Sequence, residues 1–372
     1  MRSLICAGGT GGGVYPALAV LQASGCNAEQ VLWVGGKGGM EADLVQRTGI
    51  PFQTIPAAGV HGVGLRTLPG NLWSLAKGFV AAKRILRQFH PDVLFFTGGY
   101  VAVPMALAGW RIPSVLYVPD IEPGLALKVL ARFADTIAVT AEESRKFFSP
   151  RKTIAVTGYP TRPELSAEDR SSARQALGLS EDLPVLLVFG GSKGARSINR
   201  ALLPLLPALL MQTQVVHISG TLDWDEVQQA QAALPADLLP HYHAFSYLHT
   251  EAMAQALASA DLAVSRAGAS TLGEYPLFGL PSVLVPYPYA WRYQKVNADY
   301  LVKQGAAVMI EDARLNEQLL NTVETLLGNP DRLNVMRSAA RAQAHPLAAR
   351  QIAALVEEAA RKAVQRREVH HG

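Results

Sequence analysis

Short apolar runs recur along the whole chain and alternate with longer stretches of helical periodicity. In the first half they predict strands at residues 4–7, 31–34, 93–96, 114–118, 136–139 and 154–156. In the second half they predict strands at residues 185–189, 215–218, 262–265, 282–285 and 307–310. Strands that are apolar throughout and separated by helices are typical of parallel sheets covered on both faces. The pattern therefore predicts an α/β protein.

The pattern starts twice, which indicates two domains. Each half opens with a strand, a glycine-containing loop and a helix, GGTGGG at 8–13 and GGSKGA at 190–195. A chain of 372 residues is also long for one core. We expect a first domain at 1–162, a second at 163–340, and a helical segment at 341–372 that crosses back to the first. The polar, proline-containing stretch 160–180 predicts a linker, and 339–367 predicts one long helix.

Composition narrows the class of protein. Apolar residues make up 49% and charged residues 17%, as in a well-packed globular protein. The net charge of +4 suits an anionic ligand or membrane surface, and no basic run suggests nucleic acid. Two cysteines suit a reducing compartment. With no signal peptide and no apolar run of the roughly 18–20 residues that span a bilayer, we expect a cytoplasmic protein.

The stretch from Val264 to Asn297 is the most informative part of the chain. Small residues at 266–271 follow a predicted strand and precede a helix, where free N–H groups favour a phosphate. Glu274 lies one turn into that helix, where a carboxylate accepts hydrogen bonds from ribose hydroxyls. Gln294 and Asn297 supply amides that suit sugar hydroxyls. The alternative is an ordinary turn between a strand and a helix.

Neither glycine-rich loop fits a common nucleotide motif. GGTGGG and GGSKGA both lack the spacing of a P-loop, and the first also lacks that of a dinucleotide fingerprint. Asp223 and Asp225 have the spacing of a metal-binding DxD. With other carboxylates nearby, we expect a solvated acidic turn there instead.

Taken together, the motifs resemble one family. GGTGG from residue 8, GGY at 98–100, GGSKGA at 190–195, SRAGAST at 265–271 with Glu274, and Gln294 with Asn297 are similar to MurG over residues 1 to about 350. That family transfers N-acetylglucosamine from UDP-GlcNAc and converts lipid I to lipid II in peptidoglycan synthesis. The resemblance implies the GT-B fold, two Rossmann-like doubly wound parallel-sheet domains facing a central cleft. It places the donor nucleotide in the C-terminal domain and the acceptor lipid in the N-terminal one, with no cofactor and no metal.

The resemblance also assigns substrate contacts. They fall on Thr10, Gly11, Gly12, Gly13, Asp120, Arg162, Ser192, Lys193, Leu248, Ala269, Ser270, Thr271, Leu272, Gly273, Glu274, Gln294 and Asn297. Ser192 would contact the donor phosphate, beside Lys193 where the family has Gln. Glu274 would hold the ribose, Leu248 would line the uracil pocket, and Gln294 would contact the sugar.

The chain departs from the family on the acceptor side. Gly13 occupies the position of a family His that is a candidate base or diphosphate contact. Residues 117–120, Tyr-Val-Pro-Asp, replace the family's His-Glu-Gln-Asn. Tyr100 of the GGY motif is retained, and we expect it at the catalytic site.

An inverting transfer needs a base within about 3 Å of the acceptor hydroxyl. Asp120 is the best substitute in the sequence, followed by Glu122 and by His61 in the loop 57–65. The alternative for Asp120 is a turn-forming residue between Pro119 and Pro123.

A helix at residues 72–86 carries a second signal. Apolar and cationic side chains alternate along it, namely Leu72, Trp73, Leu75, Phe79 and Leu86 with Lys77, Lys83, Arg84 and Arg87. Such a helix covers a sheet, or binds the anionic cytoplasmic face of the membrane, as a polyprenyl-linked acceptor requires. Both roles can share one helix.

The sequence thus predicts an inverting transferase acting on the 4-hydroxyl of a polyprenyl-diphospho-muramoyl peptide. One rival is a relative on the same fold with another acceptor, or a UDP-GlcNAc epimerase. Another is a nucleotide-sugar-binding protein that has lost catalysis.

Overall fold

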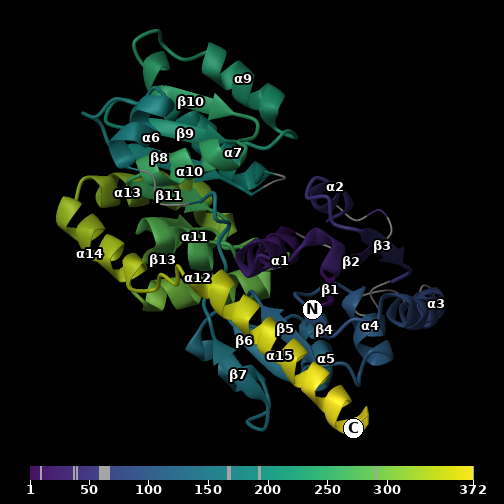
Figure 1. Ribbon diagram of the computed structural model, residues 1–372. Helices are drawn as coiled ribbons and strands as arrows, with labels where there is room; N and C mark the ends of the chain where they lie inside the picture. Colours follow the sequence, from purple (N-terminus) through teal and green to yellow (C-terminus); the bar gives the residue numbers. More distant parts are fainter. Residues whose placement is uncertain are drawn as a thin grey trace. The chain divides into compact units, whose positions relative to one another are not determined.

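The computed structural model describes residues 1–8, 11–36, 38, 41–57, 68–165, 169–191, 194–289 and 291–371. The chain divides into two compact units (Figure 1). The first comprises residues 1–162 together with 346–372, and the second comprises residues 163–345.

The first unit is built on a parallel sheet. Its strands are β1 (Ser3–Cys6), β2 (Val31–Gly36), β3 (Phe52–Ile55), β4 (Val93–Phe96), β5 (Ser114–Val118), β6 (Thr136–Val139) and β7 (Thr153–Val156). Their spatial order is β3-β2-β1-β4-β5-β6-β7, and every neighbouring pair is parallel. The order runs outward from β1 in both directions, which is the doubly wound arrangement.

Helices cover both faces of this sheet. They are α1 (Gly11–Ser24), α2 (Glu41–Gln46), α3 (Leu68–Phe89), α4 (Ala102–Ala108), α5 (Leu125–Phe133) and the C-terminal α15 (Ala348–His371). Alternate strand residues, such as Leu4 and Cys6 or Leu94 and Phe96, share one core with α3, α4 and α5. Within the first unit, α15 packs against α1 and contacts β4 and β5 (Figure 1).

The second unit repeats the plan with a second parallel sheet. Its strands are β8 (Val185–Phe189), β9 (Gln214–Ile218), β10 (Tyr242–Phe245), β11 (Leu262–Ser265), β12 (Ser282–Leu284) and β13 (Ala307–Met309). Their order is β10-β9-β8-β11-β12-β13, again with parallel neighbours. Strands β9 and β10 lie on one side of β8, and β11 to β13 lie on the other, so the strand order changes direction between β8 and β11. Ligands of such sheets bind beyond the carboxyl ends of the two strands at this point.

The helices of the second unit also lie on both faces of its sheet. They are α6 (Arg170–Ala176), α7 (Arg196–Leu202), α8 (Leu206–Leu209), α9 (Trp224–Ala232), α10 (Thr250–Ser259), α11 (Thr271–Phe278), α12 (Trp291–Lys303), α13 (Leu315–Leu327) and α14 (Pro330–Arg341). Residues of α7, α8, α9 and α13 share a core with alternate strand residues such as Leu186 and Val188. The prediction of doubly wound parallel sheets is confirmed for each unit.

Two strands were missing from the sequence prediction, and both are edge strands. β3 has two exposed polar residues, Gln53 and Thr54, at its centre. β10 is mostly half-buried and contains His243. An edge strand pairs on one side only and need not be apolar throughout. The edge strands β7 and β13 keep an apolar run and were predicted, whereas polar residues interrupt β3 and β10.

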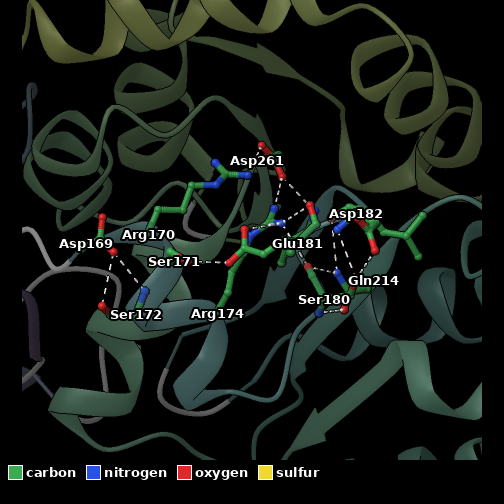
Figure 2. Close-up of polar contacts among 12 residues, drawn as sticks. Asp169, Arg170, Ser171, Ser172, Arg174, Ser180, Glu181, Asp182, Gln214 and Asp261 are labelled. Atoms are coloured by element: carbon green, nitrogen blue, oxygen red, sulfur yellow. Dashed lines mark hydrogen bonds and ion pairs between the residues drawn. The ribbon is translucent and has the colours of Figure 1, made fainter.

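The prediction of a linker at residues 160–180 was wrong in part, because α6 lies inside it. Asp169 caps this helix by accepting a 3.1 Å hydrogen bond from the backbone N–H of Ser172. The carboxylate of Asp261, at the start of β11, then binds Arg170 at 2.5 Å and Arg174 at 3.0 Å (Figure 2). Arg174 is 3% exposed. A buried ion pair of this kind is strongly destabilising to break, so α6 is an integral part of the second unit.

The single helix expected at 339–367 was also wrong. α14 ends at Arg341, α15 begins at Ala348, and Pro346 lies between them. Proline cannot donate a backbone hydrogen bond and pushes the residue before it out of the helical conformation, which explains the break. Among the helices of the described ranges, none is long and apolar enough to cross a membrane.

Candidate active site

The loop between β11 and α11 forms a compact turn. The N–H groups of Thr271 and Leu272 each donate a 3.1 Å hydrogen bond three residues back, to Gly268 and Ala269. The helical turn therefore begins earlier than α11 itself. Within the described residues, the N–H groups of Ala269 and Ser270 have no acceptor. Such donors at a helix start favour an anion.

Arg266, which the sequence analysis did not single out, fixes this loop. Its guanidinium donates to Asp312 at 2.5 Å, to the hydroxyl of Ser197 at 2.7 Å and to the carbonyl of Val285 at 3.1 Å. The Ser197 hydroxyl donates in turn to Asp312 at 2.6 Å. We call Arg266, Ser197, Asp312 and Val285 the arginine clamp. It joins the start of α7 to the segments that follow β11, β12 and β13.

The predicted ribose ligand Glu274 lies in the first turn of α11. Its backbone N–H donates to Ser270 at 2.8 Å, and the residue is 9% exposed. Thr271, Leu272 and Gly273 beside it are buried, and Ala269 is 8% exposed. These predicted contact residues therefore expose little surface.

The two amides on α12 have different surroundings. Asn297 is fully buried and donates a 3.2 Å hydrogen bond to the carbonyl of Ala267. It supports the loop from behind, whereas the sequence suggested a contact with sugar hydroxyls. Gln294 is half-buried, and its side-chain oxygen accepts a 2.8 Å hydrogen bond from the backbone N–H of Tyr287.

The second glycine-containing loop follows β8 and precedes α7. Gly194 has φ of +77°, and a Cβ there would overlap the carbonyl oxygen of Ser219. The loop therefore lies against the segment that follows β9. Only glycine permits both the positive φ and this close approach.

A buried polar network lies behind that loop. The amide nitrogen of Asn199 donates to the Ser219 carbonyl and to Asp223, both at 2.9 Å, which fixes the orientation of its amide. Its oxygen therefore accepts from Nε2 of His217 at 3.0 Å, and Nδ1 of His217 accepts from the Tyr242 hydroxyl at 2.7 Å. Burial lowers the pKa of His217 to about 4. The imidazole is neutral at physiological pH.

The prediction of a solvated acidic turn at Asp223 was wrong. Asp223 is 5% exposed and binds Arg196 at 2.8 Å as well as Asn199. The exposed Arg196 and the buried Asn199 both donate to its oxygens, while Asp225 is exposed on the first turn of α9. Asp223 is therefore a structural anchor for α7.

In the first unit, the segments after β1 and β4 interlock. Gly99 has φ of +84°, and a Cβ there would lie 2.7 Å from the carbonyl oxygen of Gly8. The Thr97 hydroxyl donates a 2.7 Å hydrogen bond to the carbonyl of Gly13. Gly13 lies with Gly11 and Gly12 in the first turn of α1. A Cβ on Gly13 would stand 3.3 Å from the Thr97 carbonyl, so this position is tight as well.

The residues at 117–120, which replace the family's His-Glu-Gln-Asn, and the nearby Glu122 differ in their burial. Tyr117 is fully buried, and its hydroxyl lies 2.8 Å from that of Thr140. Burial raises the pKa of the Tyr117 phenol well above its usual value. Glu122 is 5% exposed and paired with Lys128 at 3.1 Å. Asp120 is half-buried in the connection between β5 and α5.

Three of the predicted acceptor-side positions follow neighbouring strands. Gly13 comes after β1, Tyr100 after β4 and Asp120 after β5, and these strands are adjacent. The carboxyl ends of parallel strands meet at one edge of the sheet, so the three positions lie at the same edge. Tyr100 is 50% exposed. Arg162, at the end of the first unit, stacks its guanidinium 4.8 Å from the Tyr15 ring of α1.

The remaining predicted positions divide into two groups. Leu248 is half-buried in the short connection from β10 to α10, between Tyr247 and His249, whose rings are 5.2 Å apart. Thr10, Ser192, Lys193 and the candidate base His61 lie outside the described residues. In the parts of the chain that the structure describes, no group of three His, Cys, Asp or Glu side chains is placed to hold a metal ion.

Comparisons with known proteins agree with this plan. Residues 3–139 match the glycosyltransferase family 28 N-terminal domain, and residues 185–352 match the glycosyltransferase family 28 C-terminal domain. The chain is 41% identical to a protein of Roseiflexus sp. named UDP-N-acetylglucosamine–N-acetylmuramyl-(pentapeptide) pyrophosphoryl-undecaprenol N-acetylglucosamine transferase, over 96% of this chain and 94% of the relative. A protein of the same name from Desulforamulus reducens is 37% identical over 96% of this chain and 98% of its own length.

Solved structures support the same fold. The crystal structure of Acinetobacter baumannii MurG matches with a TM-score of 0.76 and 30% identity, over 96% of this chain and 99% of that one. A UDP-GlcNAc 2-epimerase from Neisseria meningitidis, bound to UDP-GlcNAc, matches with a TM-score of 0.68 but 12% identity, over 96% and 100% of the two chains. That second likeness concerns the fold alone. The fold is GT-B, as expected, and the chain belongs to glycosyltransferase family 28.

Proposed function

We propose that this protein transfers N-acetylglucosamine from UDP-GlcNAc to the 4-hydroxyl of a polyprenyl-diphospho-muramoyl peptide, with inversion at the anomeric carbon. The acceptor oxygen forms the new bond to that carbon, the bond to the diphosphate breaks, and UDP leaves. The observation that carries the proposal is the turn at 268–270, which Arg266 holds in place. Relatives that match this chain over nearly their whole length bear the name of this transferase.

On the donor side, the N–H groups of Ala269 and Ser270 bind the diphosphate. Developing negative charge on the leaving UDP is stabilised by such preoriented donors. Glu274, one turn further along α11, accepts hydrogen bonds from the ribose hydroxyls. Gln294 contacts the sugar, and Leu248 lines the uracil pocket.

On the acceptor side, Asp120 acts as the base. Tyr117 is in the core, and Glu122 is buried and paired with Lys128, so neither matches Asp120 in access to a substrate. Tyr100, on the adjacent strand end, contacts the acceptor. The absence of a histidine at Gly13, after β1, is then compensated at the end of β5, two strands away in the same sheet.

The lipid-linked acceptor requires approach to the membrane, and α3 supplies a suitable surface. Leu72, Trp73 and Val80 of this helix are 54%, 63% and 68% exposed. Lys77 lies 5.3 Å from the Trp73 ring. Exposed apolar side chains beside cations suit an anionic bilayer surface. We assign this surface to peripheral binding at the cytoplasmic face of the membrane.

Release of UDP from UDP-GlcNAc, with and without the lipid-linked muramoyl peptide, tests the proposal. We expect release only with the acceptor, and unchanged release after EDTA treatment. Formation of a new UDP-sugar without acceptor would indicate an epimerase. Tight UDP-GlcNAc binding with no turnover on any muramoyl lipid would indicate a binding protein that has lost catalysis.

A further inference from the structure

Two exposed tyrosines stand beside the donor loop and have no part in the mechanism above. Tyr287 and Tyr289 follow β12, are 41% and 88% exposed, and hold their ring centroids 5.6 Å apart. Tyrosine is enriched at interfaces, because its ring is apolar while its hydroxyl can stay in water. Their position at the carboxyl edge of the sheet places them where a ligand of this fold binds.

Tyr287 is held in place by two residues of the donor side, Gln294 and Arg266. The backbone N–H of Tyr287 donates a 2.8 Å hydrogen bond to Gln294, and the Arg266 guanidinium lies 5.3 Å from the Tyr287 ring. Arg266 is in turn fixed by Asp312 and Ser197. Tyr287 is therefore positioned by the same clamp that fixes the loop at 266–271.

The sequence around the tyrosines restricts their motion. Pro286 and Pro288 flank Tyr287, so the backbone of the Pro-Tyr-Pro-Tyr segment has few accessible conformations. A rigid segment presents its aromatic rings at a low entropic cost on binding. The structure thus combines exposure with preorganisation.

We propose that Tyr287 and Tyr289 form an aromatic wall of the donor pocket and stack against the hexosamine ring of the nucleotide sugar. An aromatic face carries partial negative charge and attracts the polarised C–H groups on the apolar face of a pyranose. The assignment rests on the proposed function, because the hexosamine must lie near Gln294. It adds a contact to the sugar and none to the nucleotide.

This division gives a direct test with UDP and UDP-GlcNAc as probes, measured by calorimetry. Tyr289→Ala should weaken UDP-GlcNAc binding roughly three- to tenfold, the range expected for one aromatic contact, and leave UDP binding unchanged. Tyr289→Phe keeps the aromatic face and should bind both ligands like the unmutated protein. Met211→Ala, at an apolar position before β9 that is 71% exposed, is the control for surface truncation.

Three outcomes would overturn the aromatic wall. They are unchanged UDP-GlcNAc affinity in Tyr289→Ala, an equal loss of UDP affinity, and a rise confined to the KM of the acceptor. The last would assign the tyrosines to the acceptor instead. If the unmutated protein bound neither UDP nor UDP-GlcNAc, the proposed function would fail first, and the donor-sugar assignment with it.

Discussion

The hydroxyl of Thr97 donates a 2.7 Å hydrogen bond to the carbonyl of Gly13, 84 residues earlier in the chain. This bond ties the end of β4 to the first turn of α1, next to the close approach of Gly99 to Gly8. A side chain at Gly13 would press on Thr97. The glycine that replaces the family's histidine is thus part of a tight packing arrangement.

We expect Thr97→Val to lower the free energy of unfolding by about 1 kcal/mol, the usual net value of one intramolecular hydrogen bond. Valine has nearly the same shape but no hydroxyl to donate. Urea denaturation measures the change, and Thr97→Ser, which keeps the hydroxyl, is the control. A loss of stability in Thr97→Ser with none in Thr97→Val would instead assign the effect to packing of the methyl group.

Glu274→Ala should weaken UDP binding by roughly 1–3 kcal/mol, the loss expected for a hydrogen bond to a charged group. The carboxylate is the proposed acceptor for the ribose hydroxyls, and alanine removes it without disturbing the helix. Calorimetry with UDP gives the affinity, and circular dichroism shows whether the variant is folded. A folded variant with unchanged affinity would rule out this role of Glu274.

Stability should fall on acidification because of His217. Burial holds its pKa at about 4 in the folded protein, against an ordinary value of 6.5. The unfolded chain binds this proton more readily than the folded protein. The stability that neutral His217 contributes is therefore complete above pH 6.5 and is lost as the pH falls towards 4. The loss amounts to about 3 kcal/mol.

The variant His217→Gln isolates this effect. It should be less stable than the unmutated protein at pH 7, because the hydrogen bonds to Tyr242 and Asn199 are altered. Its stability should nevertheless depend less on pH between 7 and 4. Denaturant titrations at several pH values measure the difference in the free energy of unfolding between the two proteins. The carboxylates titrate in both proteins, so their effect cancels in this difference. Parallel pH profiles would show that His217 does not titrate as described.

The sequence was sufficient for the central strands because their residues are buried on both faces. Leu186, Leu187 and Val188 of β8 are all fully buried, so the strand is one apolar run. The edge strands β3 and β10 give no such signal, since Gln53, Thr54 and His243 interrupt their apolar residues. α6 was hidden for another reason. Its burial depends on arginines that pair with Asp261, and composition alone makes such a stretch resemble a linker.

The candidate site was predictable only where it is local in sequence. The small residues at 266–271 and Glu274 are close together in the chain and could be found as a motif. Arg266 binds Ser197 and Asp312, which are 69 and 46 residues away, and only the folded sheet brings them together. The burial of Asn297 likewise depends on how α12 packs against the loop, which spacing does not reveal.

The surface of α3 should govern membrane binding. Replacing Leu72 and Trp73 together with Ser should reduce binding to anionic liposomes roughly tenfold or more, the order expected from the lost apolar area. The melting temperature should change little, because both side chains are exposed. Val335→Ser, at an exposed position on α14, is the control. Phe79 is half-buried, so Phe79→Ser should instead lower the melting temperature.

The remaining question is whether Asp120 has taken the place of the missing histidine. It is half-buried and follows β5, next to the strand that leads to Tyr100. Asparagine has the same shape and can still accept a hydrogen bond, but it cannot take a proton. Asp120→Asn should therefore lower turnover by about 10²–10⁴, the usual contribution of a positioned base, while UDP-GlcNAc binding stays nearly the same.

The neighbouring carboxylate provides the matched control. Glu122→Gln removes the ion pair with Lys128, so it should lower the melting temperature but leave turnover within a few-fold of normal. Gly13→His in the Asp120→Asn background should restore part of the rate only if Thr97 shifts by a few tenths of an ångström, since a Cβ at Gly13 meets the Thr97 carbonyl at 3.3 Å. Near-normal turnover in Asp120→Asn would exclude Asp120 as the base and leave His61 or a bound water. A rate that falls in Glu122→Gln but not in Asp120→Asn would transfer the role to Glu122.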